Sequence, residues 1–331
     1  MPLARSTLAP QPAIPALLEL FATRPLVALG ELHGCQDEAD FVTALLHHPA
    51  FPATVQVIVV EFGNARHQAL VDRFVAGEPV AARDLRRVWR EFIGWGFDNP
   101  MYEQFFRTVR AVNRTLPPGQ RLRVVLGDPP LDWTQTKLTN QHEIDAVMQQ
   151  RDEHFAAVVE AQVLAPGCRG LLIAGQGHFI REWPMSNAPQ MRNAVQLLEH
   201  RHPGCAHLVF THAGFGPETG ALEPYLTDWP IPSLVSLHAT WLGELDVALH
   251  FANTTPAGFA PPPLKPGFTF GHIADSYLYL GPRSSLTKST ANPAIYRGDE
   301  EYLTYLRQRE SLGPFTVDSL LTEDDPRYFP D

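Results

Sequence analysis

The sequence predicts an α/β fold with a mostly parallel central sheet that helices cover on both faces. The prediction rests on short continuous apolar runs, on helical patterns between these runs, and on the apolar content of the chain. Of the 331 residues, 44% are hydrophobic, which excludes a mainly disordered protein. Because strand and helix alternate, neighbouring strands should run parallel. We therefore expect a single α/β domain over residues 1–331.

Buried strands are predicted wherever a short run is rich in leucine and β-branched residues without polar alternation. Five runs meet this description: Leu26–Gly30, Val55–Val60, Leu122–Gly127, Leu171–Gly175 and His207–Phe210. Weaker runs at Leu234–Leu237 and Ala274–Leu280 predict two further strands. Apolar residues at helical spacing predict helices at Asp37–His47, Gln141–Leu164 and Asp299–Glu310.

The connection between the second and third strands is too long for one crossover helix. Residues 64–118 predict three helices, at Ala65–Ala76, Ala81–Ile93 and Pro100–Leu116. A long insertion of this kind usually lies over the site of an α/β enzyme, so we expect a helical cap. The alternative is that this surface forms the interface of a homo-oligomer. Residues 230–331 are predicted to be irregular and proline-rich.

Charge and composition exclude several functions. The formal net charge of −10 argues against nucleic acid as a partner. No run of 18 apolar residues occurs, so no membrane span is expected, and no signal peptide is recognised at the start of the sequence. Three scattered cysteines do not suggest a disulfide framework. These features predict a cytoplasmic protein that acts on a small molecule.

Ligands of open parallel sheets bind beyond the carboxyl ends of the strands. Each of the first five predicted strands is followed by an ionisable side chain near a glycine. The set that points most directly to chemistry is Glu31, His33, Glu61 and His178. Two carboxylates and two imidazoles can divide acid and base catalysis between them, or can bind a divalent metal ion. The residue types alone leave both alternatives open.

A second group of side chains is predicted to contact the substrate: Asp128, Arg151, His154 and His212. Arg151 and His154 lie one helical turn apart, and the guanidinium is suited to binding a carboxylate or an oxyanion. The alternative for this pair is an ordinary salt-bridged helix surface. His212 is equally consistent with a ligand contact and with the plain end of a strand.

The order of these motifs resembles a superfamily that contains erythromycin esterase-like proteins, ChaN-like haem-binding proteins and Tiki/TraB metalloproteases. The matching segments are Leu29–Gly34, Val59–Glu61, Arg151–Asp152 and Gly177–His178, within a region of about 25–215. The resemblance implies that Glu31, His33, Glu61 and His178 form the active site. One departure is that only Leu32 separates the glutamate and histidine of the first motif, where the esterases have two residues.

The resulting prediction is a hydrolase that activates water against an ester or amide carbonyl, with or without a divalent metal ion. The alternative is a haem- or porphyrin-binding protein of the ChaN type without catalysis. In that case His33 or His178 would be the axial ligand. Aromatic residues of the insertion would cover the macrocycle, namely Trp89, Phe92, Trp95 and Phe97.

Overall fold

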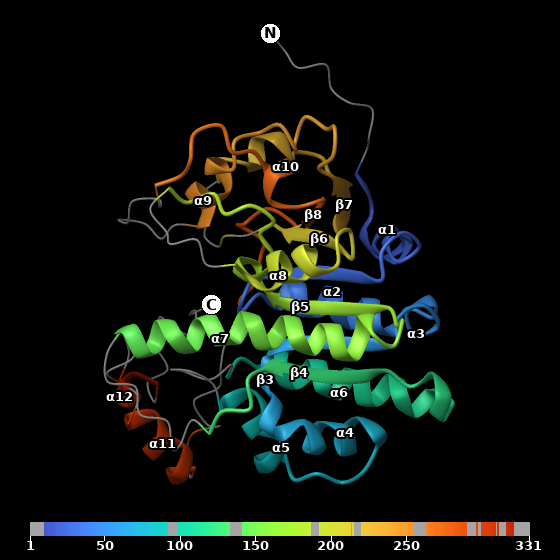
Figure 1. The fold of residues 1–331 in the computed structure, drawn as a ribbon, viewed down its shortest axis with the longest axis vertical. Coiled ribbons are helices and arrows are strands. Elements are labelled where there is room, and N and C mark those ends of the chain that lie inside the picture. The colour runs from blue at the N-terminus through green and yellow to red at the C-terminus, as the bar shows by residue number, and fades with distance from the viewer. Residues whose placement is uncertain are drawn as a thin grey trace.

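The predicted α/β fold is confirmed by a computed structural model of the chain (Figure 1). It describes residues 10–91, 98–132, 141–186, 192–212, 214, 220–254, 263–289, 296, 299–308, 310 and 316–320. Eight strands form one sheet in the order β1-β7-β8-β6-β2-β5-β3-β4. The strands are β1 Gln11–Pro12, β2 Leu26–Glu31, β3 Val57–Asn64, β4 Arg123–Asp128, β5 Gly170–Gly175, β6 Ala206–Thr211, β7 Ser233–Ser236 and β8 Ser276–Tyr279.

All seven predicted strands are confirmed, with ends shifted by no more than a few residues. The sheet is parallel from β8 through β6, β2, β5 and β3 to β4, and β7 alone runs against its neighbours β8 and β1. The edge strand β1 was not predicted, because two residues that begin a proline-interrupted segment carry no strand pattern.

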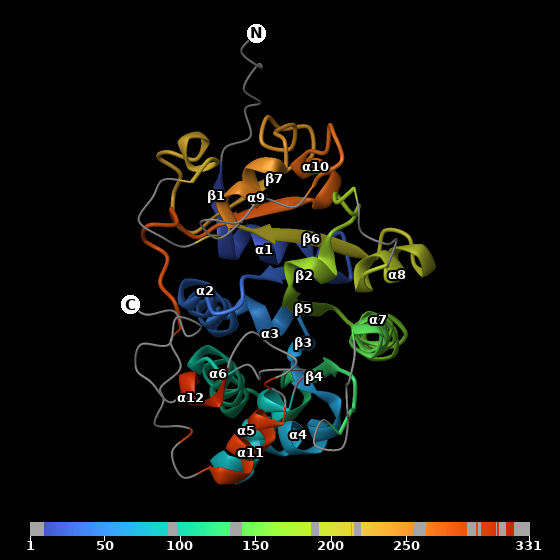
Figure 2. The ribbon, with the colours of Figure 1, turned by 90° about the vertical axis from the view of Figure 1, so that its left-hand side faces the viewer.

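Two helical layers cover the sheet, as Figure 2 shows edge-on. One contains α1 Ala13–Leu20, α2 Gln36–His47, α3 Ala50–Thr54, α4 Gln68–Ala76, α5 Ala82–Arg90 and α6 Pro100–Thr115. The other contains α7 Gln141–Val159, which continues as a π-helix to Leu164, with α8 Ala194–Arg201 and α10 Phe270–Ile273. Alternate strand residues serve the two layers: Val27 and Leu29 face the first, and Leu26 and Ala28 face the second.

The remaining elements are short or lie near the C-terminus. The 3-10 helices are Ala65–His67, Pro118–Gln120, Gln176–Phe179 and Glu223–Tyr225, and the other helices are α9 Ala248–Thr254, α11 Glu300–Arg307 and α12 Val317–Leu320. The helices α11 and α12 share a separate apolar cluster, which contains Tyr302 and Tyr305. The described part of the predicted irregular region thus supplies two strands of the sheet and its own small core.

The three helices predicted within residues 64–118 are confirmed as α4, α5 and α6. Their apolar faces join the core of the first helical layer, where α6 packs on α2 and α4 packs on β4. The Trp89 side chain is 3% exposed and stacks on Phe106, with ring centroids 5.4 Å apart. Since this ring is used within the fold, it does not offer a surface to a macrocycle. Phe92, Trp95 and Phe97 lie outside the described residues.

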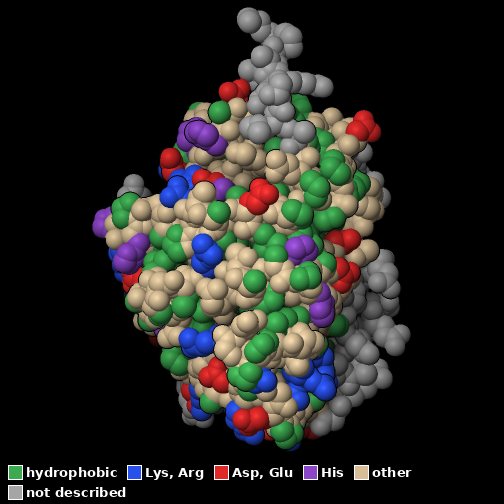
Figure 3. All heavy atoms as spheres, turned by 90° about the vertical axis from the view of Figure 1, so that its right-hand side faces the viewer, with side chains coloured by type: hydrophobic (Ala, Val, Ile, Leu, Met, Phe, Trp, Pro, Cys, Tyr) green, Lys and Arg blue, Asp and Glu red, His purple; other side chains and the backbone are tan. Residues whose placement is uncertain are grey.

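None of the described helices combines the length and the apolar character that crossing a membrane requires. On the face drawn in Figure 3, acidic and basic side chains are interspersed among hydrophobic ones.

Candidate active site

The sheet order brings the carboxyl ends of five parallel strands together, from β6 through β2, β5 and β3 to β4. In this register Glu31, the last residue of β2, lies opposite Gly175, the last residue of β5. On the other side of β5, Val60 of β3 lies opposite Ile173, so Glu61 reaches the same edge. Residues that are remote in the sequence therefore meet beyond the ends of β2, β5 and β3.

The carboxylate of Glu61 is the centre of the site. It follows Val60, where the pairing of β3 with β4 becomes irregular, and its side chain is 4% exposed. One oxygen, Oε2, accepts a hydrogen bond from the Gly175 backbone N–H at 2.6 Å. The other, Oε1, accepts from Arg151 Nη2 at 2.9 Å and from His178 Nε2 at 3.2 Å. Burial opposes the charge, but His178, His33 and Arg151 together hold the pKa of Glu61 well below its usual range.

His178 lies between two carboxylates. It follows β5 within the 3-10 helix Gln176–Phe179, and its Nδ1 donates to Asp152 Oδ1 at 2.6 Å. The same Asp152 oxygen accepts from the Ala194 N–H at the start of α8, which fixes the carboxylate. Burial lowers the pKa of His178, but Glu61 and Asp152 outweigh this effect and raise it to about 10. His178 is therefore an imidazolium at neutral pH.

His33 is held by the first carboxylate. Its Nδ1 donates to Glu31 Oε1 at 3.0 Å, and the same oxygen accepts from the Tyr102 hydroxyl of α6 at 2.8 Å. The His33 Nε2 atom lies 3.8 Å from Glu61 Oε2. Partial removal from water lowers the pKa of His33, but the charge and hydrogen bond of Glu31, with the charge of Glu61, raise it above its usual value.

The two imidazoles are the accessible members of the cluster. The His33 side chain is 47% exposed and that of His178 is 16% exposed, whereas those of Glu31 and Glu61 are 2% and 4% exposed. Both Nε2 atoms face the two oxygens of one carboxylate. Gly175 makes this approach possible, because a Cβ at this position would lie 2.7 Å from His33 Nε2. The set of four predicted active-site residues is thus brought together in space.

The residues predicted to contact substrate lie elsewhere than expected. Arg151 and Asp128 are 3% and 1% exposed, and Arg151 Nε donates to Asp128 Oδ1 at 2.5 Å. Burial raises the pKa of Asp128 to about 6, although Arg151 opposes the shift. Arg151 thus bridges Asp128 and Glu61, and both Arg151 and Asp128 are buried.

The two remaining candidates are also engaged with the protein. His154 Nδ1 donates to the Gly127 carbonyl at 3.0 Å. His212 is 0% exposed, its Nδ1 lies 2.7 Å from the Tyr277 hydroxyl, and its Nε2 lies 3.6 Å from Glu223 Oε1. His212 therefore belongs to a buried polar cluster with Tyr277 of β8 and Glu223.

Sequence reasoning missed one residue that shapes the site and assigned no role in it to a second. Tyr102 is 71 positions from Glu31, and an aromatic residue on the apolar face of a helix carries no sign that its hydroxyl reaches a carboxylate. Asp152 was named beside Arg151 in the matching motif, where a surface salt bridge was an equally good interpretation. The signal that could have found it is that Arg151–Asp152 and Gly177–His178 belong to one set of motifs, because a functional histidine is commonly oriented by a carboxylate.

The donor set does not fit a metal ion. Both nitrogens of His178 donate hydrogen bonds to carboxylates, and a metal needs an unprotonated imidazole nitrogen. Glu61 is already compensated by Arg151 and His178. Within the described residues, no group of three or more His, Cys, Asp or Glu side chains is placed to hold a metal ion.

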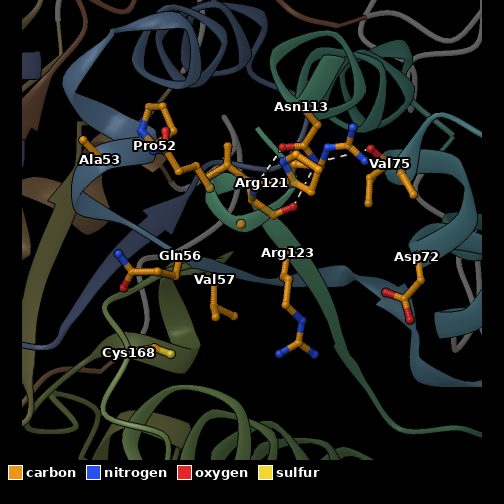
Figure 4. Close-up of a pocket in the computed structure, with 15 residues that line it drawn as sticks. Pro52, Ala53, Gln56, Val57, Asp72, Val75, Asn113, Arg121, Arg123 and Cys168 are labelled. Carbon is orange, nitrogen blue, oxygen red and sulfur yellow. Dashed lines mark hydrogen bonds between the residues drawn. The ribbon is translucent and has the colours of Figure 1, made fainter. Parts of the chain in front are cut away.

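A hollow of about 760 Å³ lies at the opposite edge of the sheet (Figure 4). Its lining includes Val57 and Arg123, the first residues of β3 and β4, together with Asn113 and Cys168. Because it opens at the amino ends of the strands, it is separate from the cluster of glutamates and histidines.

Solved structures of other proteins have a similar fold. No family model and no curated protein matches the chain. Among solved structures, a histidine-to-asparagine mutant of erythromycin esterase EreC, in its open conformation, is 13% identical at a TM-score of 0.53. The match covers 83% of this chain and 94% of that chain. The fold is that of the erythromycin esterase.

A second solved structure supports the same fold. A Bacillus cereus protein is 12% identical at a TM-score of 0.52, over 87% of this chain and 96% of that chain. A haem-bound ChaN of Campylobacter jejuni is 12% identical over 60% of this chain and 86% of that chain, at a lower TM-score of 0.37. The similarity to the esterase is thus one of overall architecture.

The close approach of His33 to Gly175 leads to a first prediction. Gly175→Ala should displace the His33 imidazole, since the added Cβ would lie 2.7 Å from Nε2 and 3.3 Å from Glu61 Oε2. Its φ of −50° suits alanine, so we expect a stability loss of no more than about 1–3 kcal/mol. The measurement is the position of the His33 ring resonances in ¹H–¹³C spectra. Gly177→Ala, whose Cβ would meet nothing within 4 Å, is the control, and unchanged His33 signals in Gly175→Ala would contradict this geometry.

The raised pKa of His178 leads to a second prediction. A histidine whose pKa rises on folding stabilises the protein fully below its unfolded value, near 6.5, and loses this contribution as pH rises toward about 10. The difference in unfolding free energy between wild type and His178→Gln should therefore shrink between pH 6.5 and 10. Denaturant unfolding at several pH values measures it. His202→Gln, a surface histidine beside Glu160, is the control, and a difference that stays constant with pH would refute the expectation.

Proposed function

We propose that this chain is a hydrolase in which His33 activates water against an ester or amide carbonyl of a small molecule. One observation carries the proposal: two accessible imidazoles direct their Nε2 atoms at the two oxygens of a single buried carboxylate, at 3.8 and 3.2 Å. A buried charge shared between two solvent-facing titratable groups is typical of catalytic sites. Among the described site residues that the sequence predicts, this is the one carboxylate that two imidazoles face.

His33 is the general base of the proposal. Its Nδ1–H is fixed on Glu31 Oε1, so Nε2 is the nitrogen that takes a proton from the attacking water. Tyr102 holds the same glutamate oxygen and keeps the pair in one orientation. The half-exposed ring allows water and substrate to reach it.

His178 is the general acid. Its pKa of about 10 keeps it protonated at neutral pH, and its Nε2–H is held by Glu61 at 3.2 Å, a longer contact than the 2.6 Å bond of Nδ1 to Asp152. In the proposed reaction the carbonyl carbon gains a bond to the water oxygen, and the bond to the leaving group breaks. The leaving oxygen or nitrogen takes the His178 proton, and solvent returns both histidines to their starting states.

Glu61 positions both imidazoles, and Arg151 with Asp128 positions Glu61. In this proposal the predicted substrate contacts Asp128, Arg151, His154 and His212 are assigned to support, because each makes at least one side-chain hydrogen bond within the fold. A metal-assisted route is not adopted, since the donor set does not fit a cation.

The fold lends support of a general kind. The EreC structure belongs to an erythromycin esterase, and ester hydrolysis on this architecture agrees with the proposed chemistry. A macrolide substrate is not part of the proposal. The proposal includes a cytoplasmic location, because Cys35, Cys168 and Cys205 are all free thiols.

Haem binding is the weaker proposal. The half exposure of His33 favours it as an axial ligand, but Trp89, the one described member of the predicted aromatic cover, is buried in the core. Titration with haemin distinguishes the two proposals, since a sharp absorption shift that His33→Ala abolishes would favour haem.

The variants that test the hydrolase are His33→Ala, Glu61→Gln and His178→Ala. Each should lower turnover by about 10²–10⁴-fold, the usual contribution of general acid–base catalysis. The assay is a panel of p-nitrophenyl esters and aminoacyl p-nitroanilides with the full chain. His202→Ala is a matched control, because His202 is 47% exposed like His33 and also contacts a glutamate. Full turnover in Glu61→Gln and His178→Ala, on any substrate the wild type hydrolyses, would rule out this mechanism.

The two histidines also predict the shape of the pH profile. The base must be neutral, so kcat/KM should rise as His33 loses its proton, at a pH above its ordinary 6.5. The acid must be charged, so kcat/KM should fall as pH passes about 10, where His178 deprotonates. Steady-state kinetics from pH 5 to about 11 measures both limbs. A profile that keeps rising through pH 10 would remove His178 from the role of acid.

A further inference from the structure

A small cavity lies beside Glu31, with residues of α2 and α6 in its lining. It has a volume of about 20 Å³ and is lined by Glu31, Glu38, Tyr102 and apolar side chains that include Val42 and Phe62. A volume above about 10–15 Å³ can hold one water molecule if polar partners are present. The cavity is therefore large enough for a single water.

Two carboxyl oxygens at this cavity have no hydrogen-bond partner among the described residues, namely Glu31 Oε2 and Glu38 Oε1. Glu31 is 4% exposed and Glu38 is 1% exposed, so bulk solvent does not satisfy these atoms. A buried carboxyl oxygen without a partner is costly. Because both carboxyl groups line the same water-sized cavity, one water molecule could supply the missing hydrogen bonds of both oxygens.

We propose that one water molecule in this cavity links Glu31 Oε2 to Glu38 Oε1, and that Glu38 takes part in the link as a neutral carboxylic acid. Glu38 is then a positioning residue for the Glu31–His33 pair. Its effect on catalysis rests on the proposed function, whereas the link itself does not.

The distribution of donors decides which carboxyl group carries the charge. Glu31 accepts hydrogen bonds from His33 Nδ1 and from the Tyr102 hydroxyl. Among the described residues, Glu38 accepts one side-chain hydrogen bond, from the Leu32 N–H at 2.8 Å. Two buried carboxylates that line one cavity repel each other, so the one with fewer hydrogen-bond donors, Glu38, binds a proton. Burial and the Glu31 charge raise the pKa of Glu38 well above its usual range.

The other titratable groups that face Glu38 remain uncharged at neutral pH. Burial, with Glu31, Glu61 and Glu38, raises the pKa of Tyr102 well above its usual value. Burial and the neighbouring acids raise the pKa of the Cys35 thiol to about 12. Of these neighbouring groups, Glu31 is therefore the one that places a negative charge beside Glu38.

The link changes the behaviour of His33. A hydrogen bond donated to Glu31 Oε2 spreads the carboxylate charge and weakens its attraction for an imidazolium. The pKa of His33 is thereby kept closer to neutrality than Glu31 alone would allow. A base with such a pKa is deprotonated for a larger part of the time at neutral pH.

The test is the titration of His33, followed by ¹H–¹³C NMR of the ring in the full chain and assigned with His33→Gln. In Glu38→Leu the donor to the water link is lost, so the pKa of His33 should rise by about 0.5 units or more. In Glu38→Gln the amide still accepts from Leu32 and still has a donor for the cavity, so the pKa should stay at the wild-type value. Gly177→Ala is the control for nonspecific effects of a substitution, because its Cβ would meet nothing within 4 Å, and it should leave the pKa of His33 unchanged.

The sign of the shift makes the alternatives distinguishable. If Glu38 were ionised, both variants would remove a negative charge and the pKa of His33 would fall in both. If Glu38 served only as a brace at the start of α2, neither variant would move it. Either result overturns the proposal.

Infrared spectroscopy keeps the test independent of Glu38→Leu, should that variant not fold. Wild type minus Glu38→Gln at pH 7 should show the carbonyl stretch of a protonated carboxylic acid, shifted in D₂O, and a carboxylate band in its place would overturn the proposal. Neither measurement uses a substrate. The link can therefore hold in a protein without hydrolase activity, and hydrolysis can occur in a protein without the link.

Discussion

The structure of the site depends on the burial of one negative charge, that of Glu61. A carboxylate with a side chain that is 4% exposed is tolerated only when its oxygens are compensated. Three donors do this: the Gly175 N–H, the Arg151 guanidinium and the His178 imidazolium. Each comes from a different segment, so the charge ties β3, β5 and α7 together. The protonation of His178 is a consequence of the same arrangement.

The topology of the sheet is what allows these segments to converge. Because β5 lies between β2 and β3, the carboxyl ends that carry Glu31 and Glu61 flank Gly175. A parallel sheet directs all of these ends to one edge, and the absence of a side chain on Gly175 leaves room for His33. The insertion between β3 and β4 then contributes Tyr102 from within the helical layer, which stabilises the orientation of Glu31. The packing of α6 on the sheet therefore contributes to the site, in addition to the segments that follow the strands.

Much of the fold could be predicted, because buried parallel strands leave continuous apolar runs such as Val57–Val60 and Leu171–Ala174. Elements with little pattern could not: β1 has two residues, and α1 begins in a proline-interrupted segment. The sequence also pointed to the correct side chains at the strand ends. It could not say that Arg151 and Asp128 turn inward, because an arginine on a helix is more often a surface group, and only burial distinguishes the two.

By itself the sequence determined the α/β class, the parallel strands and the identity of Glu31, His33, Glu61 and His178 as a group at one edge of the sheet. These follow from local apolar patterns and from the direction of parallel strands, both of which are written along the chain. Only the tertiary structure decided the charge states and partners within that group. A pKa depends on burial and on charges from other elements, such as Asp152 of α7 beside His178 or Glu38 of α2 near Glu31, and those distances do not exist until the layers have packed.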